Sequence, residues 1–158
     1  MERLLKLLEN DCRLTTEQLA AMLKAECAEI DAAIQKYEKD GVILGYNALI
    51  DWDKTERECT TALIELKVTP QRDCGFDRVA ERIYQFPEVQ SLYLISGGFD
   101  LALIIEGRTL REVALFVAEK LSTLDEVTST ATHFVLRKYK EKGVIYGKPY
   151  TDERGNEF

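Results

Sequence analysis

The order of hydrophobic patterns in the second half of the chain is the feature that most limits what this sequence can fold into. Stretches with the alternation expected of strands cover residues 60–68, 89–96, 100–106 and 127–139. A helical stripe between the first two strands consists of Phe76, Val79, Ile83 and Phe86. A second helical stripe follows the predicted N-cap Thr109, between the last two strands. The predicted order is therefore strand, helix, strand, strand, helix, strand.

This order is the split βαβ motif, in which an antiparallel sheet has both helices packed on one face. We therefore predict the α+β class, with a ferredoxin-like β-α-β-β-α-β sandwich over residues 59–140. The other sheet face still has apolar and Thr residues. We expect a second subunit to cover that face, as in a homodimer or a higher oligomer.

The first fifty residues predict a separate winged helix-turn-helix domain, residues 1–50. The first helix has an apolar stripe of leucines and ends near Asn10. Thr15 and Gln18 have the spacing of a capping box at the start of the second helix. The predicted inward face of the third helix, which begins near Glu26, consists of Cys27, Ile30, Ile34 and Tyr37. Gly41 then ends the third helix, and residues 42–50 predict a hairpin wing.

Two segments fall outside these domains. Residues 51–58 are polar, highly charged and without periodicity, which predicts a linker. Residues 141–158 are predicted to form a C-terminal tail, in which 143–146 has the composition of one further short strand.

The sequence predicts a cytoplasmic protein with no membrane segment. No apolar run approaches the about 20 residues that a membrane-spanning helix needs. The first ten residues place charges between their leucines, which argues against a signal peptide.

Composition also argues against a metal centre, a cofactor or catalysis. The four cysteines are scattered, so we expect free thiols in small core sites, and the single His133 lies within a predicted strand. No nucleophile elbow or nucleotide-binding glycine loop is present. We therefore predict a protein that is not an enzyme and binds neither metal nor cofactor.

Five short motifs, in order along the chain, resemble the Lrp/AsnC family of leucine- and asparagine-responsive transcription regulators. They are Leu19-Ala20-x-x-Leu23, Ile30-x-x-x-Ile34, Gly41-Val42-Ile43-x-Gly45-Tyr46, Ser96-Gly97-Gly98-Phe99-Asp100, and Thr130, Thr132 with 134–138. The resemblance implies a DNA-binding head and an αβ sandwich that dimerises. It also implies that a small effector, an amino acid, binds near the turn that contains Asp100.

The candidate effector site therefore consists of Gly97, Gly98, Phe99, Asp100, Thr130 and Thr132. Two interpretations of the glycines stay open, because glycine also permits the positive φ of a tight hairpin. In the functional interpretation the bare backbone N–H groups receive a ligand carboxylate, and Asp100 receives its ammonium group. Likewise, Thr130 and Thr132 are either hydroxyl ligands or a threonine ladder within the sheet.

The predicted partner of the third helix is double-stranded DNA, with contacts from Gln35, Lys36 and Lys39. The net charge of the whole chain is −7, and residues 1–50 contain nine acidic against six basic residues. Family members favour Ser or Thr at the cap and basic residues on this helix, where this chain has Glu26, Glu29 and Asp31. Lys24 also stands in the turn where the family favours Gly. Repulsion from phosphate leads us to expect weak or oligomer-dependent DNA binding.

Two alternatives remain. The chain could sense a ligand, or join mixed oligomers, after losing DNA binding. The second alternative is an enzyme like the sirohaem decarboxylases, which resemble this architecture. Those enzymes depend on His and Arg clusters in the sandwich, where this chain has Gly97, Gly98, Phe99 and Asp100.

Overall fold

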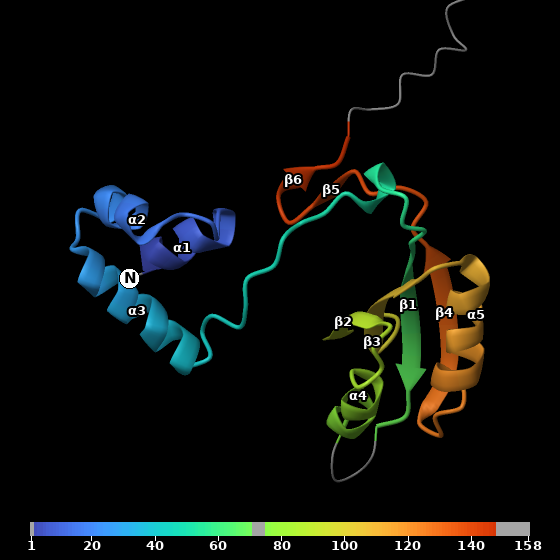
Figure 1. The fold of residues 1–158 in the computed structure, drawn as a ribbon. Helices are drawn as coiled ribbons and strands as arrows, with labels where there is room; N and C mark the ends of the chain where they lie inside the picture. Colours follow the sequence, from blue (N-terminus) through green and yellow to red (C-terminus); the bar gives the residue numbers. More distant parts are fainter. Residues whose placement is uncertain (1, 71–74, 148–158) are drawn as a thin grey trace, which may run out of the picture. The chain divides into compact units, whose positions relative to one another are not determined.

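The computed structural model describes residues 2–70 and 75–147 of the chain (Figure 1). It divides into two compact units, residues 1–50 and 51–158, which are considered separately below. No helix in the described part of the chain is long and apolar enough to cross a membrane.

The N-terminal unit, called the head below, contains the three predicted helices α1 (Glu2–Asn10), α2 (Thr16–Leu23) and α3 (Cys27–Lys39). Its core consists of Leu4, Leu8, Leu19, Ala20, Ile30 and Ala33. The capping box at the start of α2 is confirmed. The Gln18 N–H donates to Thr15 Oγ1 over 3.3 Å, and the Thr15 N–H donates to Gln18 Oε1 over 2.9 Å.

The turn between α2 and α3 depends on Lys24 in the left-handed region, at φ 54° and ψ 47°. Its backbone N–H donates to the carbonyl of Ala20 and so ends α2. This conformation explains why the family favours glycine here, since glycine has no Cβ to strain it. The N-cap of α3, Glu26, makes no side-chain capping bond.

Two predictions for the head are wrong. The predicted hairpin wing is absent: residues 44–50 form no strand, and Leu44 is 93% exposed. Instead Gly41, at φ 68°, turns the chain so that the Val42 and Ile43 N–H groups both donate to the Tyr37 carbonyl. The inward face of α3 also differs: Cys27 is exposed and Ala33 is buried, because the packing stripe starts one turn later than predicted.

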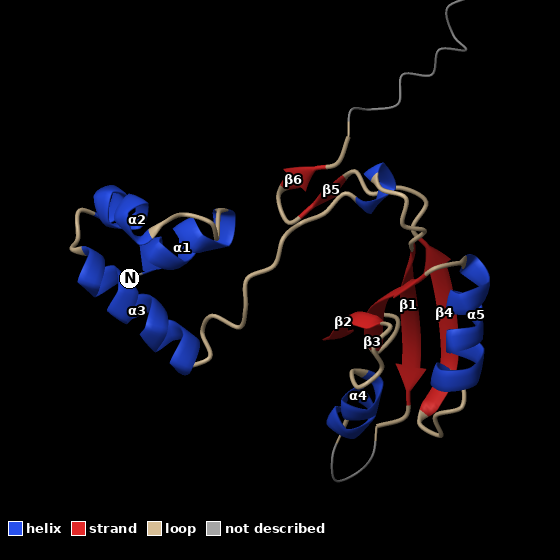
Figure 2. Cartoon of the chain, viewed as in Figure 1, coloured by secondary structure: helices blue, strands red, loops and turns tan. Residues whose placement is uncertain are grey.

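The C-terminal unit has the predicted strand–helix order and is of the α+β class (Figure 2). Its elements are β1 (Thr60–Val68), α4 (Asp77–Ile83), β2 (Val89–Leu94), β3 (Leu101–Gly107), α5 (Leu110–Phe116), the π-helical turn η2 (Val117–Leu121) and β4 (Val127–Phe134). The four strands form one sheet in the order β2-β3-β1-β4, and each neighbouring pair is antiparallel.

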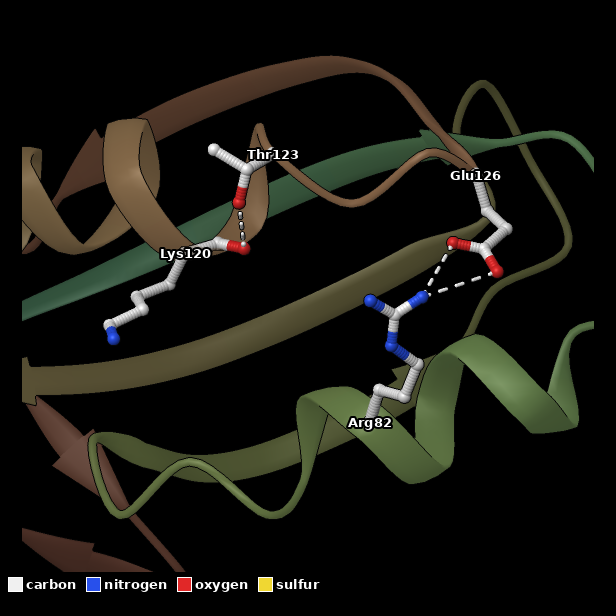
Figure 3. Close-up of polar contacts among 4 residues, drawn as sticks. All are labelled: Arg82, Lys120, Thr123 and Glu126. Atoms are coloured by element: carbon white, nitrogen blue, oxygen red, sulfur yellow. Dashed lines mark hydrogen bonds and ion pairs between the residues drawn. The ribbon is translucent and has the colours of Figure 1, made fainter.

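Alternation along β1 places its apolar residues against the helices. Ala62, Ile64, Leu66 and Val68 are buried with Val79 and Ile83 of α4 and with Val113 and Leu121 of the α5–η2 segment. Just after η2, the Thr123 hydroxyl donates to the carbonyl of Glu119. It also donates to the carbonyl of Lys120 (Figure 3).

The opposite sheet face, called the open face below, is not covered by a helix of the described part of the C-terminal unit. On it lie half-buried Leu63 and Ile104 and exposed Tyr93 and His133. His133 Nε2 lies 3.4 Å from Glu65 Oε1 on the neighbouring strand.

The segments that flank the sheet are short. A 3₁₀ turn, η1 (Trp52–Lys54), precedes β1, and the Arg57 guanidinium lies over the Trp52 ring at 4.4 Å from its centroid. β4 ends at Phe134 rather than at 139. The further short strand predicted at 143–146 is present as β6 (Val144–Ile145), which pairs with β5 (Lys140–Glu141).

Candidate effector turn and DNA-facing helix

The turn that joins β2 to β3, residues 95–100, is anchored to the end of β1 through Asp100. The Asp100 N–H donates to the Leu66 carbonyl over 2.9 Å, and Asp100 Oδ2 accepts from the Val68 N–H over 2.8 Å. The Ile95 N–H closes the turn by donating to the Asp100 carbonyl over 2.8 Å. Asp100 is therefore held by backbone donors and acceptors, and only Oδ2 has a donor within the described chain.

Neither glycine of this turn is required by the conformation of the chain. Gly97 and Gly98 both lie outside the positive-φ region, so a tight hairpin does not explain them. A Cβ on Gly97 would lie 3.7 Å from Ile95 Cγ2, which is an ordinary contact, and a Cβ on Gly98 would meet nothing within 4 Å. Both glycines are exposed, so a molecule from outside the described chain can approach their backbone.

The structure groups four of the six candidate residues and separates the other two. Phe99 is half-buried beside Asp100, whereas Thr130 and Thr132 lie half-buried on β4. Thr130 pairs with Leu66 and Thr132 with Ile64, so β1 lies between them and the turn. Two strand spacings correspond to about 10 Å. Within one chain, Asp100 and Thr130 therefore lie on opposite sides of Leu66, with one strand between them.

The three candidate DNA contacts, Gln35, Lys36 and Lys39, are all exposed on α3. Gln35 and Lys39 are one turn apart on the face opposite the buried Ile30 and Ala33, and Lys36 lies beside them. Lys36 and Lys39 also occupy the last turn of α3, where cations interact favourably with the helix dipole.

Two of the acidic residues on α3 have partners that sequence patterns did not predict. Asp31 Oδ1 accepts from the Thr16 hydroxyl over 2.7 Å, and Glu38 Oε1 accepts from the Tyr46 hydroxyl over 3.0 Å. Desolvation raises the pKa of Tyr46, and the hydrogen bond to Glu38 raises it further. Both pairs join residues from different elements, so no local spacing could have indicated them.

The cysteines are arranged differently from the prediction of small core sites. Cys12 and Cys27 are exposed, and Cys59 is half-buried. Desolvation raises the pKa of the Cys59 thiol, and the nearby charge of Glu106 adds to the shift. The fourth residue, Cys74, lies outside the described residues. Among the described residues, no group of three or more His, Cys, Asp or Glu side chains could hold a metal ion.

A hollow of about 270 Å³ lies at the opposite end of the sheet from the turn, between the start of β2 and the end of β3. Its charged lining includes Arg57, Arg108, Glu88, Glu106 and Glu112. Among the described residues, none forms a hydrogen bond with Glu88 Oε2, which is enclosed there. Nothing in the sequence patterns had indicated this feature.

Comparison with known proteins identifies relatives for both units. Residues 61–145 match the family described as the Lrp/AsnC ligand binding domain. The HTH-type transcriptional regulator YugG of Bacillus subtilis is 47% identical over 152 residues, which cover 96% of this chain and 92% of the relative.

Solved structures have the same fold. Escherichia coli AsnC superposes with a TM-score of 0.69 at 19% identity, covering 87% of this chain and 91% of AsnC. A transcriptional regulator from Neisseria meningitidis in complex with L-Met superposes with a TM-score of 0.72 at 22% identity, covering 87% of this chain and 88% of the regulator.

Proposed function

Because the chain belongs to the Lrp/AsnC family of HTH-type transcription regulators, we propose that it binds double-stranded DNA as a homodimer or higher oligomer. In this proposal an amino acid at the turn 95–100 changes the assembly or the DNA affinity. Its site of action is the cytoplasm, where the DNA lies. No catalytic step is included, in keeping with relatives that are named as regulators.

The observation on which the effector site rests is the pair of glycines beside Asp100. Neither is needed for φ or for packing, and both are exposed near the carboxylate of Asp100. N–H groups bind a carboxylate and Asp100 binds an ammonium group, so the turn offers both halves of an amino acid backbone a partner. Thr130 and Thr132 on β4, one strand beyond β1, remain candidate hydroxyl contacts for the same ligand.

The matching experiment is calorimetric titration of the protein with the L-amino acids, L-methionine among them. Gly98→Ala adds a Cβ that meets nothing in the chain, so the variant should keep its melting temperature and bind at least about 10-fold more weakly. Asp100→Asn should weaken binding as well, whereas Asp125→Asn, exposed on another loop, is the control. Unchanged affinity in Gly98→Ala would contradict an effector site at this turn.

The open face supports the proposed dimer. Half-buried Leu63 and Ile104 lie there, no described element of the same unit packs over them, and apolar sheet faces of this kind are stabilised by a second layer. Ile104→Glu should convert the dimer to a monomer in light-scattering measurements. Leu110→Glu changes an exposed residue on α5 and should leave the dimer intact.

The DNA contacts are proposed to come from Gln35, Lys36 and Lys39 at the exposed face of α3. The test is a titration with duplex DNA from upstream of the protein's own gene, repeated over a salt series. Lys36→Ala should weaken binding to all sequences and reduce the salt slope by about 1 per head. The same titration of Lys120→Ala, on η2 of the other unit, is the control.

A second candidate function is a ligand-sensing or mixed-oligomer partner that no longer binds DNA. It is favoured by Glu26 and Glu29, which are exposed at the leading end of α3. No binding at low salt, by protein that is folded and dimeric, would select this alternative.

A further inference from the structure

The one histidine of the chain, His133, has an acidic partner on the open face. His133 Nε2 on β4 lies 3.4 Å from Glu65 Oε1 on β1. The two side chains are 54% and 33% exposed, so water still reaches both of them. The contact is an ion pair only when the imidazole is protonated, and histidine ordinarily changes charge near about pH 6.5.

Strand pairing places Glu65 on a central strand of the open face. It lies between Ala102 of β3 and Ala131 of β4, and His133 lies opposite Leu63, one step along the same ladder. Alanine side chains are short and apolar, so neither of these neighbours can donate a hydrogen bond to the carboxylate of Glu65 or shield it. A second layer packed on this face would therefore cover that carboxylate directly.

Three other titratable groups share the open face. Lys67, two residues after Glu65 on β1, is exposed to solvent. Glu106, at the end of β3, has a lysine Nζ 3.9 Å from its Oε1, and Tyr93 is exposed on the edge strand β2. None of these three types ordinarily changes charge near neutral pH. Among the described residues of this face, His133 is therefore the group that can change the charge around Glu65 in that range.

We infer that binding of a second copy to the open face takes up a proton at His133, so that the dimer is stronger at pH 6 than at pH 8. The inference rests on the proposed function in taking the dimer to form on this face. Covering the face removes water from Glu65, and a carboxylate taken out of water is costly unless a cation accompanies it. Protonated His133 supplies that cation from the neighbouring strand. Neutral His133 leaves one net negative charge on the pair in each subunit.

The occupant is a second copy because the face has charges of both signs and can be complementary to itself. A two-fold axis brings the same face of both subunits together. With neutral His133, each subunit brings an uncompensated carboxylate to the interface, and like charges there oppose association. Lys67 compensates Glu65 less closely than His133 does, since alternate residues of a strand are about 7 Å apart.

The direction of the pH dependence follows from linkage. The dimer binds more protons than two separate subunits do, so its dissociation constant increases as pH rises through the range in which histidine titrates. With up to one proton taken up per subunit, the dissociation constant should increase about 10-fold between pH 6 and pH 8.

The test is a dilution series of the full chain in fluorescence-detected sedimentation velocity at pH 6, 7 and 8 and constant ionic strength. His133→Gln removes the titrating group, so its dissociation constant should not change over this range. Glu65→Gln should reverse the direction, because its dimer has to cover an imidazolium without a counter-charge. Glu119→Gln, which changes an exposed carboxylate on η2, is the matched control and should keep the 10-fold change. Both replaced side chains on the open face are partly exposed, so these variants should fold as the unaltered chain does.

Two results would overturn the inference and leave the proposed dimer standing. One is a dissociation constant that is equal at pH 6 and pH 8, and the other is a pH dependence that His133→Gln retains. A chain that stays monomeric at every pH would contradict the dimer itself and the inference with it. Ile104→Glu distinguishes the interfaces: if this variant still dimerises, the second copy does not bind to the open face.

Discussion

Replacing Glu29 by a basic residue should add a contact to a DNA phosphate from α3, the helix that is proposed to bind DNA. Glu29 is exposed in the first turn of α3, two turns before Lys36 along one stripe of the helix. Asp31 is less suitable, because its carboxylate accepts the 2.7 Å hydrogen bond from Thr16 that links α3 to α2. Glu29→Arg therefore changes a charge on the face of α3 that is proposed to bind DNA, without breaking a contact between the helices.

The magnitude follows from counterion release. Each phosphate neutralised steepens the dependence of affinity on salt by about 0.9 in the logarithmic slope. Lowering salt fourfold, from about 200 to about 50 mM, should then raise the affinity of Glu29→Arg by about 3.5-fold per head beyond that of Glu29→Gln. For a dimer with both heads bound the gain is about 12-fold. Loss of an acidic residue from the first turn costs about 0.3–1 kcal/mol of helix stability, but both variants lose it, so the comparison between them is not affected by that loss.

The assay is fluorescence anisotropy with a labelled duplex at several salt concentrations, with Glu29→Gln as the neutral reference. Arg111→Glu, on α5 of the other unit, checks that net charge alone does not explain the result. If Glu29→Arg and Glu29→Gln give equal affinities and equal salt slopes, α3 is not presented to DNA. The reasoning from the exposed face of α3 would then be refuted.

Three further predictions concern local conformation and titration. Lys24→Gly should stabilise the head by about 1 kcal/mol, seen as a higher melting temperature, because glycine adopts the left-handed turn without strain; a lower one would contradict it. Cys59 should be alkylated more slowly than exposed Cys12 at pH 8, measured by mass spectrometry, because desolvation raises its pKa and reduces the thiolate fraction; equal rates would refute this. Tyr46 has a raised pKa, so its hydrogen bond to Glu38 stabilises the head below about pH 10 and is lost as pH rises through the raised value. In Tyr46→Phe the melting temperature of the head should lose this dependence at alkaline pH, and an unchanged profile would count against the bond.

Much of the fold could be predicted because its determinants are local. The capping box of Thr15 and Gln18 and the stripe of Val79 and Ile83 each require only neighbours along the chain. The hairpin predicted for residues 42–50 failed for a related reason. An alternating pattern is compatible with a strand, but a strand also needs a neighbouring strand to pair with. The described chain has no strand that pairs with residues 42–50.

The candidate site was predictable only in part. Gly97, Gly98 and Asp100 are adjacent in sequence, so their grouping in one turn follows directly. Thr130 and Thr132 were added because of resemblance, and the sheet order places β1 between them and the turn. The strand order depends on which edges pair over long separations, which residue periodicity does not record.

By itself, then, the sequence determined the elements, their order and the chemistry available at the turn, because periodicity, caps and residue types act over a few residues. The tertiary structure alone decided which groups hold one another: Asp31 with Thr16, Asp100 with Val68, and Glu126 with Arg82. Residues far apart along the chain meet only when the sheet and its helices pack. The structure also shows that neither Gly97 nor Gly98 has a positive φ, so the backbone conformation of the turn does not require glycine at these positions.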